Sequence, residues 1–204
     1  DVERSRGLGD VYKRQALAVS ELAGLPIEDA LAGIAHVVVP GRLQRIDEGQ
    51  DYLAIVDYAH KPAAVAAVIA TLRSEIKGRL CVVLGAGGDR DASKRAIMGR
   101  EAARGSDLFI VTDDNPRSED PAVIRAAVEA GAYELPTEER GEVRNIGDRA
   151  AAIRAAIAWA EPGDAVLVAG KGHETGQNVN GVIHHFDDRE EVRAALQERR
   201  TGSL

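Results

Sequence analysis

From Ala16 onward, the apolar residues of the chain follow two alternating patterns. Short continuous apolar runs predict strands buried on both faces, and longer segments with apolar residues three or four positions apart predict helices. The predicted strands cover residues 52–56, 80–84, 107–112, 143–146 and 165–169. The predicted helices cover residues 62–76, 93–104, 120–131 and 148–160, and a last helix is capped by Asp187.

Strands that alternate with helices predict an α/β fold with right-handed crossovers. We expect a Rossmann-like, mostly parallel sheet with helices on both faces and a C-terminal β-hairpin plus helix. The hairpin is expected over residues 178–186, because Asn180-Gly181 is typical of a two-residue turn. Ligands of such sheets bind beyond the carboxyl ends of the strands, so the loops that follow the strands are the places to search.

The N-terminal part of the chain differs from the rest. Residues 1–15 (DVERSRGLGDVYKRQ) show neither helical nor strand periodicity and resemble translated sequencing-adapter sequence, with a disordered native terminus as the alternative. Residues 16–23 resemble the end of a helix with Gly24 as its C-cap, and a second short helix is expected from Pro26 to about Ile34. The Pro40-Gly41 break predicts a domain boundary between residues 16–39 and 40–204.

Composition narrows the class of protein. Hydrophobic residues make up 45% of the 204 residues but aromatic residues only 3%, so the core must consist of Ala, Val, Ile and Leu. The formal net charge of −7 argues against a nucleic-acid or anionic-membrane surface. Cys81 is the single cysteine, which excludes an intrachain disulfide and fits a cytoplasmic protein. No apolar run approaches the roughly 20 residues of a membrane span.

Four of the loops that follow predicted strands are rich in Gly, Asp, Arg, His or Glu. They are residues 57–60, 85–91, 113–117 and 170–174. Because the carboxyl ends of parallel strands meet at one edge of a sheet, we expect these loops to lie together. Folding alone does not explain such a concentration of polar residues at one edge.

The glycine-rich loop at residues 85–91 is not a dinucleotide-binding fingerprint, because that motif needs glycine where Arg90 stands. An arginine held by a glycine turn offers a fork for a carboxylate or a phosphate, whereas the glycines alone fit an ordinary flexible turn. In the loop at 113–117, Pro116 restricts Asn115 to extended geometry. Asp114, Asn115 and Arg117 then match the two ends of a zwitterionic amino acid. The alternative is an Asx-Pro turn with a surface arginine.

The loop at residues 170–174 (GKGHE) is neither a P-loop nor a metal site of the HExxH type. Glu174 could accept hydrogen bonds from a substrate amine, and Gly170 would allow a ligand close to the backbone. A glycine turn with solvated charges is the alternative. Asp57 and His60 end a predicted strand, where they could meet a ribose or a phosphate, and Arg42 is either a linker arginine or a phosphate contact.

Taken in order, five segments resemble the C-terminal domain of the Mur ligase family, within it the UDP-N-acetylmuramoyl-tripeptide synthetases. They read PGRLQRID, IVDYAHKP, GAGGDRDASKR, VTDDNPRSEDP and VAGKGHETGQ. The resemblance covers about residues 16–199, and the DNPR segment resembles the version associated with meso-diaminopimelate. Residues 16–39 resemble only the final helices of the family's central ATPase domain.

The resemblance implies roles for ten residues. The implied contacts to diaminopimelate are Arg90, Asp114, Asn115, Pro116, Arg117, Gly170 and Glu174. The implied contacts to ATP are Arg42, Asp57 and His60. The two arginines would grip carboxylate, and Asp114 and Glu174 would meet the ammonium of the distal stereocentre. Lysine lacks the distal carboxylate, so Arg117 would lose its partner with that ligand.

The implied reaction is the ATP-dependent addition of meso-diaminopimelate to UDP-MurNAc-L-Ala-D-Glu in peptidoglycan precursor synthesis, through an acyl phosphate and with Mg²⁺. The sequence contains no P-loop and no UDP-sugar domain, so ATP and Mg²⁺ would be held mainly by the central domain. We therefore expect this polypeptide by itself not to turn over ATP.

Three alternatives remain open on the sequence. The chain could belong to a ligase for another amino acid, lysine or glutamate, on the same scaffold. It could be a non-catalytic amino-acid-binding module. It could also be a flavodoxin-like nucleotide binder, which would predict an unpaired, solvent-facing Arg117.

Overall fold

The computed structural model describes residues 8–36 and 39–203, and the chain divides into two compact units, Asp1–Val39 and Pro40–Leu204. The first unit contains α1 (Leu8–Leu22) and α2 (Ile27–His36). Helix α1 begins at Leu8 and so includes residues 8–15, which show no helical periodicity in the sequence; Lys13, Arg14 and Gln15 are nevertheless good helix formers. Residues 1–7 lie outside the described residues.

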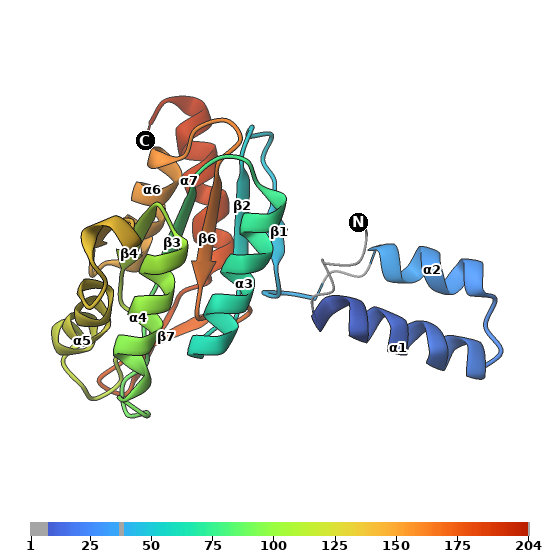
Figure 1. Cartoon of the computed structure of the whole chain (residues 1–204), viewed down its shortest axis with the longest axis horizontal. Coiled ribbons are helices and arrows are strands. Elements are labelled where there is room, and N and C mark those ends of the chain that lie inside the picture. The colour runs from blue at the N-terminus through green and yellow to red at the C-terminus, as the bar shows by residue number, and fades with distance from the viewer. Residues whose placement is uncertain (1–7, 37–38, 204) are drawn as a thin grey trace. The chain divides into compact units, whose positions relative to one another are not determined.

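The second unit is built on a six-stranded sheet in the order β1-β2-β6-β3-β4-β5 (Figure 1). The strands are β1 (Gln44–Ile46), β2 (Leu53–Asp57), β3 (Leu80–Leu84), β4 (Leu108–Val111), β5 (Glu142–Asn145) and β6 (Ala165–Ala169). All neighbouring pairs are parallel except β1 and β2, which are antiparallel. The predicted mostly parallel α/β sheet is confirmed. The sequence analysis missed the short edge strand β1, because two of its three residues are polar and it contains no apolar run.

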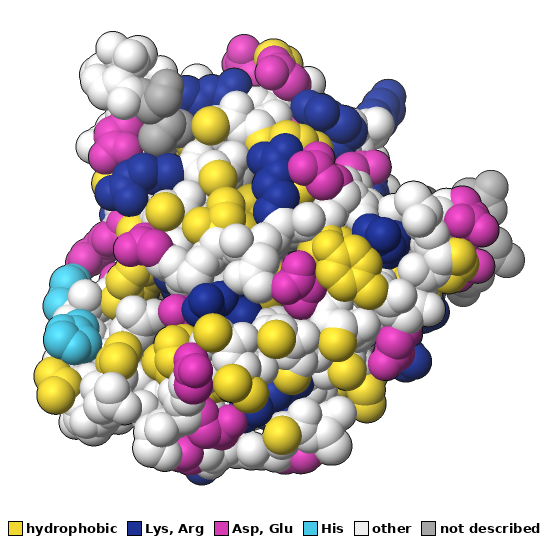
Figure 2. Space-filling view, turned by 90° about the vertical axis from the view of Figure 1, so that its left-hand side faces the viewer, with side chains coloured by type: hydrophobic (Ala, Val, Ile, Leu, Met, Phe, Trp, Pro, Cys, Tyr) yellow, Lys and Arg dark blue, Asp and Glu magenta, His cyan; other side chains and the backbone are white. Residues whose placement is uncertain are grey.

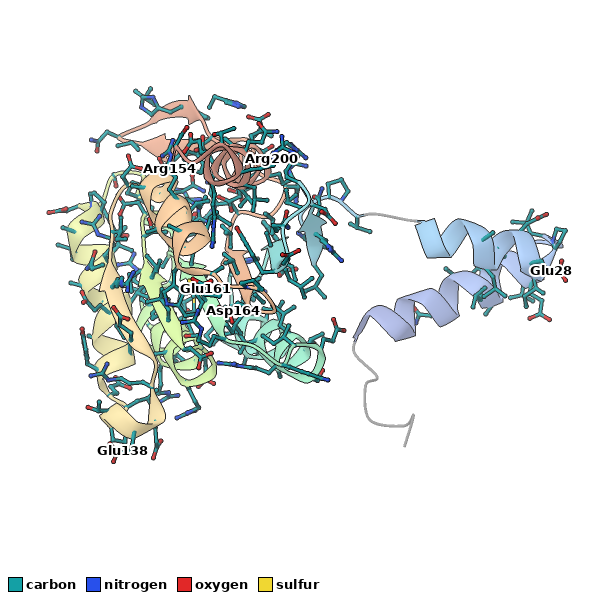
Figure 3. The ribbon with its side chains drawn as sticks, turned by 90° about the horizontal axis from the view of Figure 1, so that it is seen from above. Glu28, Glu138, Arg154, Glu161, Asp164 and Arg200 are labelled. Carbon is teal, nitrogen blue, oxygen red and sulfur yellow. The ribbon has the colours of Figure 1, made fainter. Side chains whose placement is uncertain are left out.

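Helices cover both faces of this sheet. They are α3 (Pro62–Glu75), α4 (Lys94–Gly105), α5 (Pro121–Tyr133), α6 (Arg149–Trp159) and α7 (Asp188–Thr201). Helices α3, α4 and α5 share one hydrophobic cluster with alternate strand residues, and α6 and α7 share a second cluster with the other strand residues. Arg154 of α6 donates to Glu198 of α7 at 3.1 Å, and Figure 3 shows Arg154 and Arg200 on these two helices. The four inner strands β2, β3, β4 and β6 are therefore buried on both sides, whereas the edge strands β1 and β5 are more exposed.

Cys81 of β3 is fully buried in the cluster beneath α6 and α7, as the sequence predicted for a small core residue. Burial raises the pKa of its thiol well above the usual range, because the thiolate would lose its hydration there. Cys81 is thus an inert packing residue.

The crossing of α4 and α5 explains one error in the predicted boundaries. The sequence predicted that the helix ends at Gly131, but α5 continues to Tyr133. A Cβ atom on Gly131 would lie 1.7 Å from the carbonyl oxygen of Ala96, and one on Gly99 would lie 1.8 Å from that of Val128. The glycine is needed for close packing of two helices and does not end the helix.

The predicted helix caps are formed in three cases and absent in one. The side chains of Asp120, Asp148 and Asp187 each accept a hydrogen bond from a backbone N–H in the first turn of α5, α6 and α7. Ser93 stands before α4 but makes no such bond. Its hydroxyl donates to Asp91 Oδ1 at 2.6 Å instead, so Ser93 stabilises the preceding loop.

The predicted hairpin consists of β7 (Gly176–Val179) and β8 (Val182–His185), which pair antiparallel. Asn180 (φ 50°) and Gly181 (φ 80°) occupy its turn in the left-handed region, as this turn type requires. The hairpin is attached to the loop after β4. Arg117 N donates to Asn178 O at 2.9 Å, and Asn180 N donates to Arg117 O at 2.7 Å.

A buried ion pair joins the ends of several elements. Arg149 of α6 and Asp188 of α7 are both fully buried, with Nε–Oδ1 2.7 Å and Nη2–Oδ2 2.8 Å. The same guanidinium donates to Ala169 O at 2.9 Å and to Asp113 O at 3.4 Å, at the carboxyl ends of β6 and β4. Burial opposes the charge, but the Asp188 carboxylate outweighs it and raises the pKa of Arg149.

The substitution Arg149→Ala is expected to lower the free energy of unfolding by about 3–5 kcal/mol, because it leaves the Asp188 carboxylate buried without a partner. The double substitution Arg149→Met, Asp188→Leu removes both charges and is expected to recover most of that loss. Urea unfolding followed by circular dichroism measures both values. A loss below about 1 kcal/mol in the single variant would contradict this account of the pair.

Candidate functional site

A cavity of about 320 Å³ opens at the carboxyl edge of the sheet. Its wall comes from the loops after β2, β3, β4 and β6 and from the first turns of α4. The wall includes seven of the ten residues selected from the sequence: His60, Arg90, Asp114, Asn115, Arg117, Gly170 and Glu174. The predicted convergence of these loops at one edge is therefore present in the structure. Arg42, Asp57 and Pro116 are not on this wall.

Two arginines approach each other at Gly87. A Cβ atom on Gly87 would lie 2.8 Å from Arg117 Nη1 and 3.8 Å from Arg90 Cγ, so the missing side chain makes room for both. Arg117 Nη1 donates to Gly88 O at 2.7 Å, and Arg117 is half-buried. The solvent-facing, unpaired Arg117 expected for a flavodoxin-like nucleotide binder is thus not observed. The cationic part of the wall suits a carboxylate or a phosphate.

The backbone of Arg117 is held in an unusual conformation. Its φ of 54° lies in the left-handed region, which costs a residue other than glycine about 1 kcal/mol. The hydrogen bonds to Asn178 and Asn180 of the hairpin maintain this conformation. They aim the side chain back toward Gly88, so the hairpin is part of what positions the guanidinium.

Asp114 supplies the anionic part of the wall. It is only 9% exposed, yet among the described residues no donor hydrogen-bonds to its carboxylate. Gly170 (φ 115°) lies beside it, and a Cβ atom there would be 2.7 Å from Asp114 Oδ2. A buried carboxylate without a protein partner favours a cationic ligand, since an unpaired buried charge is costly.

The carboxylate of Glu174 is a second hydrogen-bond acceptor on the wall, and one of its two oxygens already has partners in the protein. Its Oε2 accepts from Asn115 Nδ2 at 3.0 Å and lies 3.5 Å from Lys171 Nζ. Lys171 is fully buried and also donates to Asn115 Oδ1 at 3.2 Å. The sequence analysis missed Lys171, because a lysine between two glycines has the appearance of a solvated loop residue.

Pro116 shapes the loop after β4. A Cβ atom on Gly88 would lie 1.9 Å from Pro116 O, and Gly88 N donates to Asn115 O at 2.9 Å. The loops after β3 and β4 are therefore in direct backbone contact. Pro116 is buried outside the cavity wall, where its carbonyl packs on the neighbouring loop.

Asp57 has both carboxylate oxygens occupied by backbone donors. Leu43 N donates to Oδ2 at 2.7 Å and Ala59 N donates to Oδ1 at 2.8 Å. The carboxylate thus fastens the segment around Leu43 to the end of β2. In this arrangement Asp57 can position the neighbouring Arg42, but it has little capacity to bind a ligand directly.

Arg42 and His60 meet at Tyr58. The guanidinium of Arg42 lies 4.1 Å from the centre of the Tyr58 ring, a cation–π contact. His60 packs edge-on against the same ring at 4.6 Å, and the His173 ring lies at 5.3 Å. Tyr58 and His173 were not selected from the sequence. Their only signal was their place in polar segments at strand ends.

At the opposite edge of the sheet, where the parallel strands begin, buried polar residues pair with one another and stabilise the fold. Asp164, labelled with Glu161 in Figure 3, accepts from Arg79 N at 2.7 Å and from Glu161 N at 2.9 Å, and forms an ion pair with the Arg79 guanidinium. These groups satisfy one another. By contrast, the Asp114 carboxylate at the carboxyl edge has no donor among the described residues, and this difference supports the cavity as a candidate site.

One face of the molecule and two further properties complete the description. On the face in Figure 2, Lys and Arg side chains are interspersed with Asp and Glu. Within residues 8–36 and 39–203, no group of three or more His, Cys, Asp or Glu is placed to hold a metal ion. The helices in these ranges are all too short or too polar to cross a membrane.

Comparisons with known proteins agree with this geometry. Residues 41–172 match the family model described as Mur ligase, glutamate ligase domain. The chain is 62% identical over 191 residues to a UDP-N-acetylmuramoyl-L-alanyl-D-glutamate–2,6-diaminopimelate ligase of Corynebacterium glutamicum, covering 93% of this chain and 37% of that protein. A ligase of the same name from Corynebacterium efficiens is 65% identical over 184 residues, covering 89% of this chain and 35% of that protein.

A solved structure of a ligase with this name is 39% identical, with a TM-score of 0.73, and the match covers 91% of this chain and 37% of that one. The chain thus spans about a third of the length of the relatives it matches. On the strength of the matched domain and of these identities, the chain belongs to the Mur ligase family.

Proposed function

We propose that this chain is the amino-acid-binding part of an ATP-dependent ligase that adds meso-diaminopimelate to UDP-MurNAc-L-Ala-D-Glu. One observation carries the proposal: a single cavity is lined by two arginines, Arg90 and Arg117, and by Asp114, whose buried carboxylate has no hydrogen-bond donor among the described residues. An amino-acid end presents one carboxylate and one ammonium, which are the complementary charges. Seven relatives at 45–65% identity are named as 2,6-diaminopimelate ligases, which supports the choice of ligand.

In the proposed complex, Arg117 and Arg90 bind the distal carboxylate of diaminopimelate through charge-assisted hydrogen bonds. Asp114 and the free Oε1 of Glu174 receive the distal ammonium. Gly170 allows the ligand close to the backbone, since it has no side chain to fill that space. The ligand is then held at one end, and its other amino group is free to act as the nucleophile of amide-bond formation.

The chain would contribute to the reaction chiefly by positioning, which lowers the entropic part of the barrier. ATP would supply the activating phosphate and Mg²⁺ would offset its charge. By the family resemblance, Mg²⁺ would be held mainly by the central ATPase domain of the ligase, so we assign no residue of this chain to it. Arg42 and His60 remain candidates for the ATP side, and Asp57 would act by holding the Arg42 segment in place.

Isothermal titration calorimetry of the chain with meso-diaminopimelate, L-lysine and L-glutamate tests the proposal. Diaminopimelate is expected to bind, and lysine is expected to bind on the order of 100-fold more weakly, because lysine has no distal carboxylate to pair with the half-buried guanidinium of Arg117. Equal or tighter binding of lysine or glutamate would assign the site to a ligase for that amino acid. No binding of any of the three would overturn the proposal.

The substitution Arg117→Lys keeps the charge but removes the planar fork. We expect the affinity for meso-diaminopimelate to fall about 10-fold while the weak affinity for lysine changes little, so the preference between the two ligands shrinks. Arg104→Lys, on the exposed surface of α4, serves as the matched control and is expected to change neither value. An equal loss for both ligands would mean that Arg117 supports the loop without contacting the distal carboxylate.

A further inference from the structure

Lys171 is a buried cation directly behind the cavity wall. Its side chain is fully buried, although it lies in a loop and is flanked by Gly170 and Gly172. Removing an ammonium group from water costs several kcal/mol, and this cost is recovered only through close partners. The charge of Lys171 therefore acts mainly on the few polar groups close to it.

Lys171, Asn115 and Glu174 contact one another pairwise and form a triangle of polar side chains. Lys171 Nζ donates to Asn115 Oδ1 at 3.2 Å and lies 3.5 Å from Glu174 Oε2, and Asn115 Nδ2 donates to that same oxygen at 3.0 Å. Asn178 N also donates to Asn115 Oδ1, at 2.9 Å. Two donors on one side of the amide fix its orientation, so its NH₂ group must face Glu174.

This triangle controls the one flexible carboxylate of the cavity. The side chain of Glu174 is 36% exposed and would otherwise be free to adopt several rotamers. With Oε2 held by Asn115 and Lys171, Oε1 is the oxygen left for a ligand. The sequence motifs alone gave Glu174 and Asn115 separate roles, whereas the structure makes them one unit anchored on Lys171.

Charge balance points the same way. Asp114 and Glu174 line one cavity, and two carboxylates in a shared site repel each other. The cations of the wall, Arg90, Lys94 and Arg117, face the ligand space. Behind the wall, Lys171 lies next to Glu174, and the buried Arg149 acts electrostatically on both carboxylates. Lys171 therefore compensates Glu174 without occupying the space that a ligand needs.

We propose that Lys171 is a positioning residue that acts through Asn115 and Glu174 to fix the carboxylate oxygen that receives the ligand's ammonium. Lys171 itself does not touch the ligand. This inference rests on the proposed function, because it assumes that an amino acid occupies the cavity. The competing account is that Lys171 serves only to stabilise the loop after β6.

A double-mutant cycle separates the two accounts. The affinity for meso-diaminopimelate is measured by calorimetry for the unmodified chain, Lys171→Met, Glu174→Gln and the double variant. Methionine keeps the apolar stem of lysine and removes the charge. We expect each single variant to weaken binding about 10-fold and the double variant to be no weaker than Glu174→Gln, because the two residues act as one unit. Lys77→Met, on an exposed loop, is the matched control.

Additive losses in the cycle, or unchanged affinity in Lys171→Met, would overturn the inference. Absence of binding by the unmodified chain would instead overturn the proposed function, so the two failures are distinguishable. Thermal unfolding followed by circular dichroism shows whether each variant is folded at the temperature of the titration.

A measurement on the folded chain without the Lys171 substitution covers the case in which Lys171→Met does not fold. With ¹⁵N-labelled lysine, the buried ammonium of Lys171 is expected to give a slowly exchanging NMR signal. Saturating meso-diaminopimelate should shift this signal in the unmodified chain and leave it nearly unchanged in Glu174→Gln. A signal that does not respond to the ligand in the unmodified chain would refute the coupling.

Discussion

The buried guanidinium of Arg149 is the contact on which the geometry of the carboxyl edge depends. A parallel sheet ends in backbone carbonyls that have no further strand partner, and here Ala169 O and Asp113 O both accept from Arg149. These are the residues from which the loops after β6 and β4 begin. One planar group, held by the buried Asp188 carboxylate, thus joins the starts of the two loops that border the cavity.

The loops around the cavity also contact one another at glycines, where there is no room for a Cβ atom. Gly88 packs on the carbonyl of Pro116, Gly85 on that of Thr112, and Gly170 on the carboxylate of Asp114. Close backbone contact between loops from different strands makes the wall stiff, and a stiff wall can keep charged groups apart that would otherwise pair. These contacts hold the loops in which Asp114 and the arginines of the wall lie.

Much of the fold and part of the site could be predicted from the sequence, for identifiable reasons. The strands β3 and β6 were predicted to the residue because continuous apolar runs between polar loops have one interpretation in a parallel sheet. The convergence of the loops followed from the same rule. Gly131 was misread, because whether a glycine ends a helix or admits another helix depends on what lies opposite it. Asp57 and Lys171 depend likewise on partners distant in sequence, a backbone N–H of Leu43 and the amide of Asn115, which no local pattern reveals.

The attachment of the hairpin to Arg117 has a consequence for how such a domain could be redesigned. Arg117 sits between Asn178 and Asn180 as if it were one residue of a third strand, and Asn115 and Asp114 are also tied to this hairpin. The two segments therefore make up one module, although about sixty positions separate them along the chain. If the loop after β4 were grafted onto a homologous scaffold without the hairpin, its sequence would be transferred but its conformation would be lost. Recombination that respects the module would exchange both segments together.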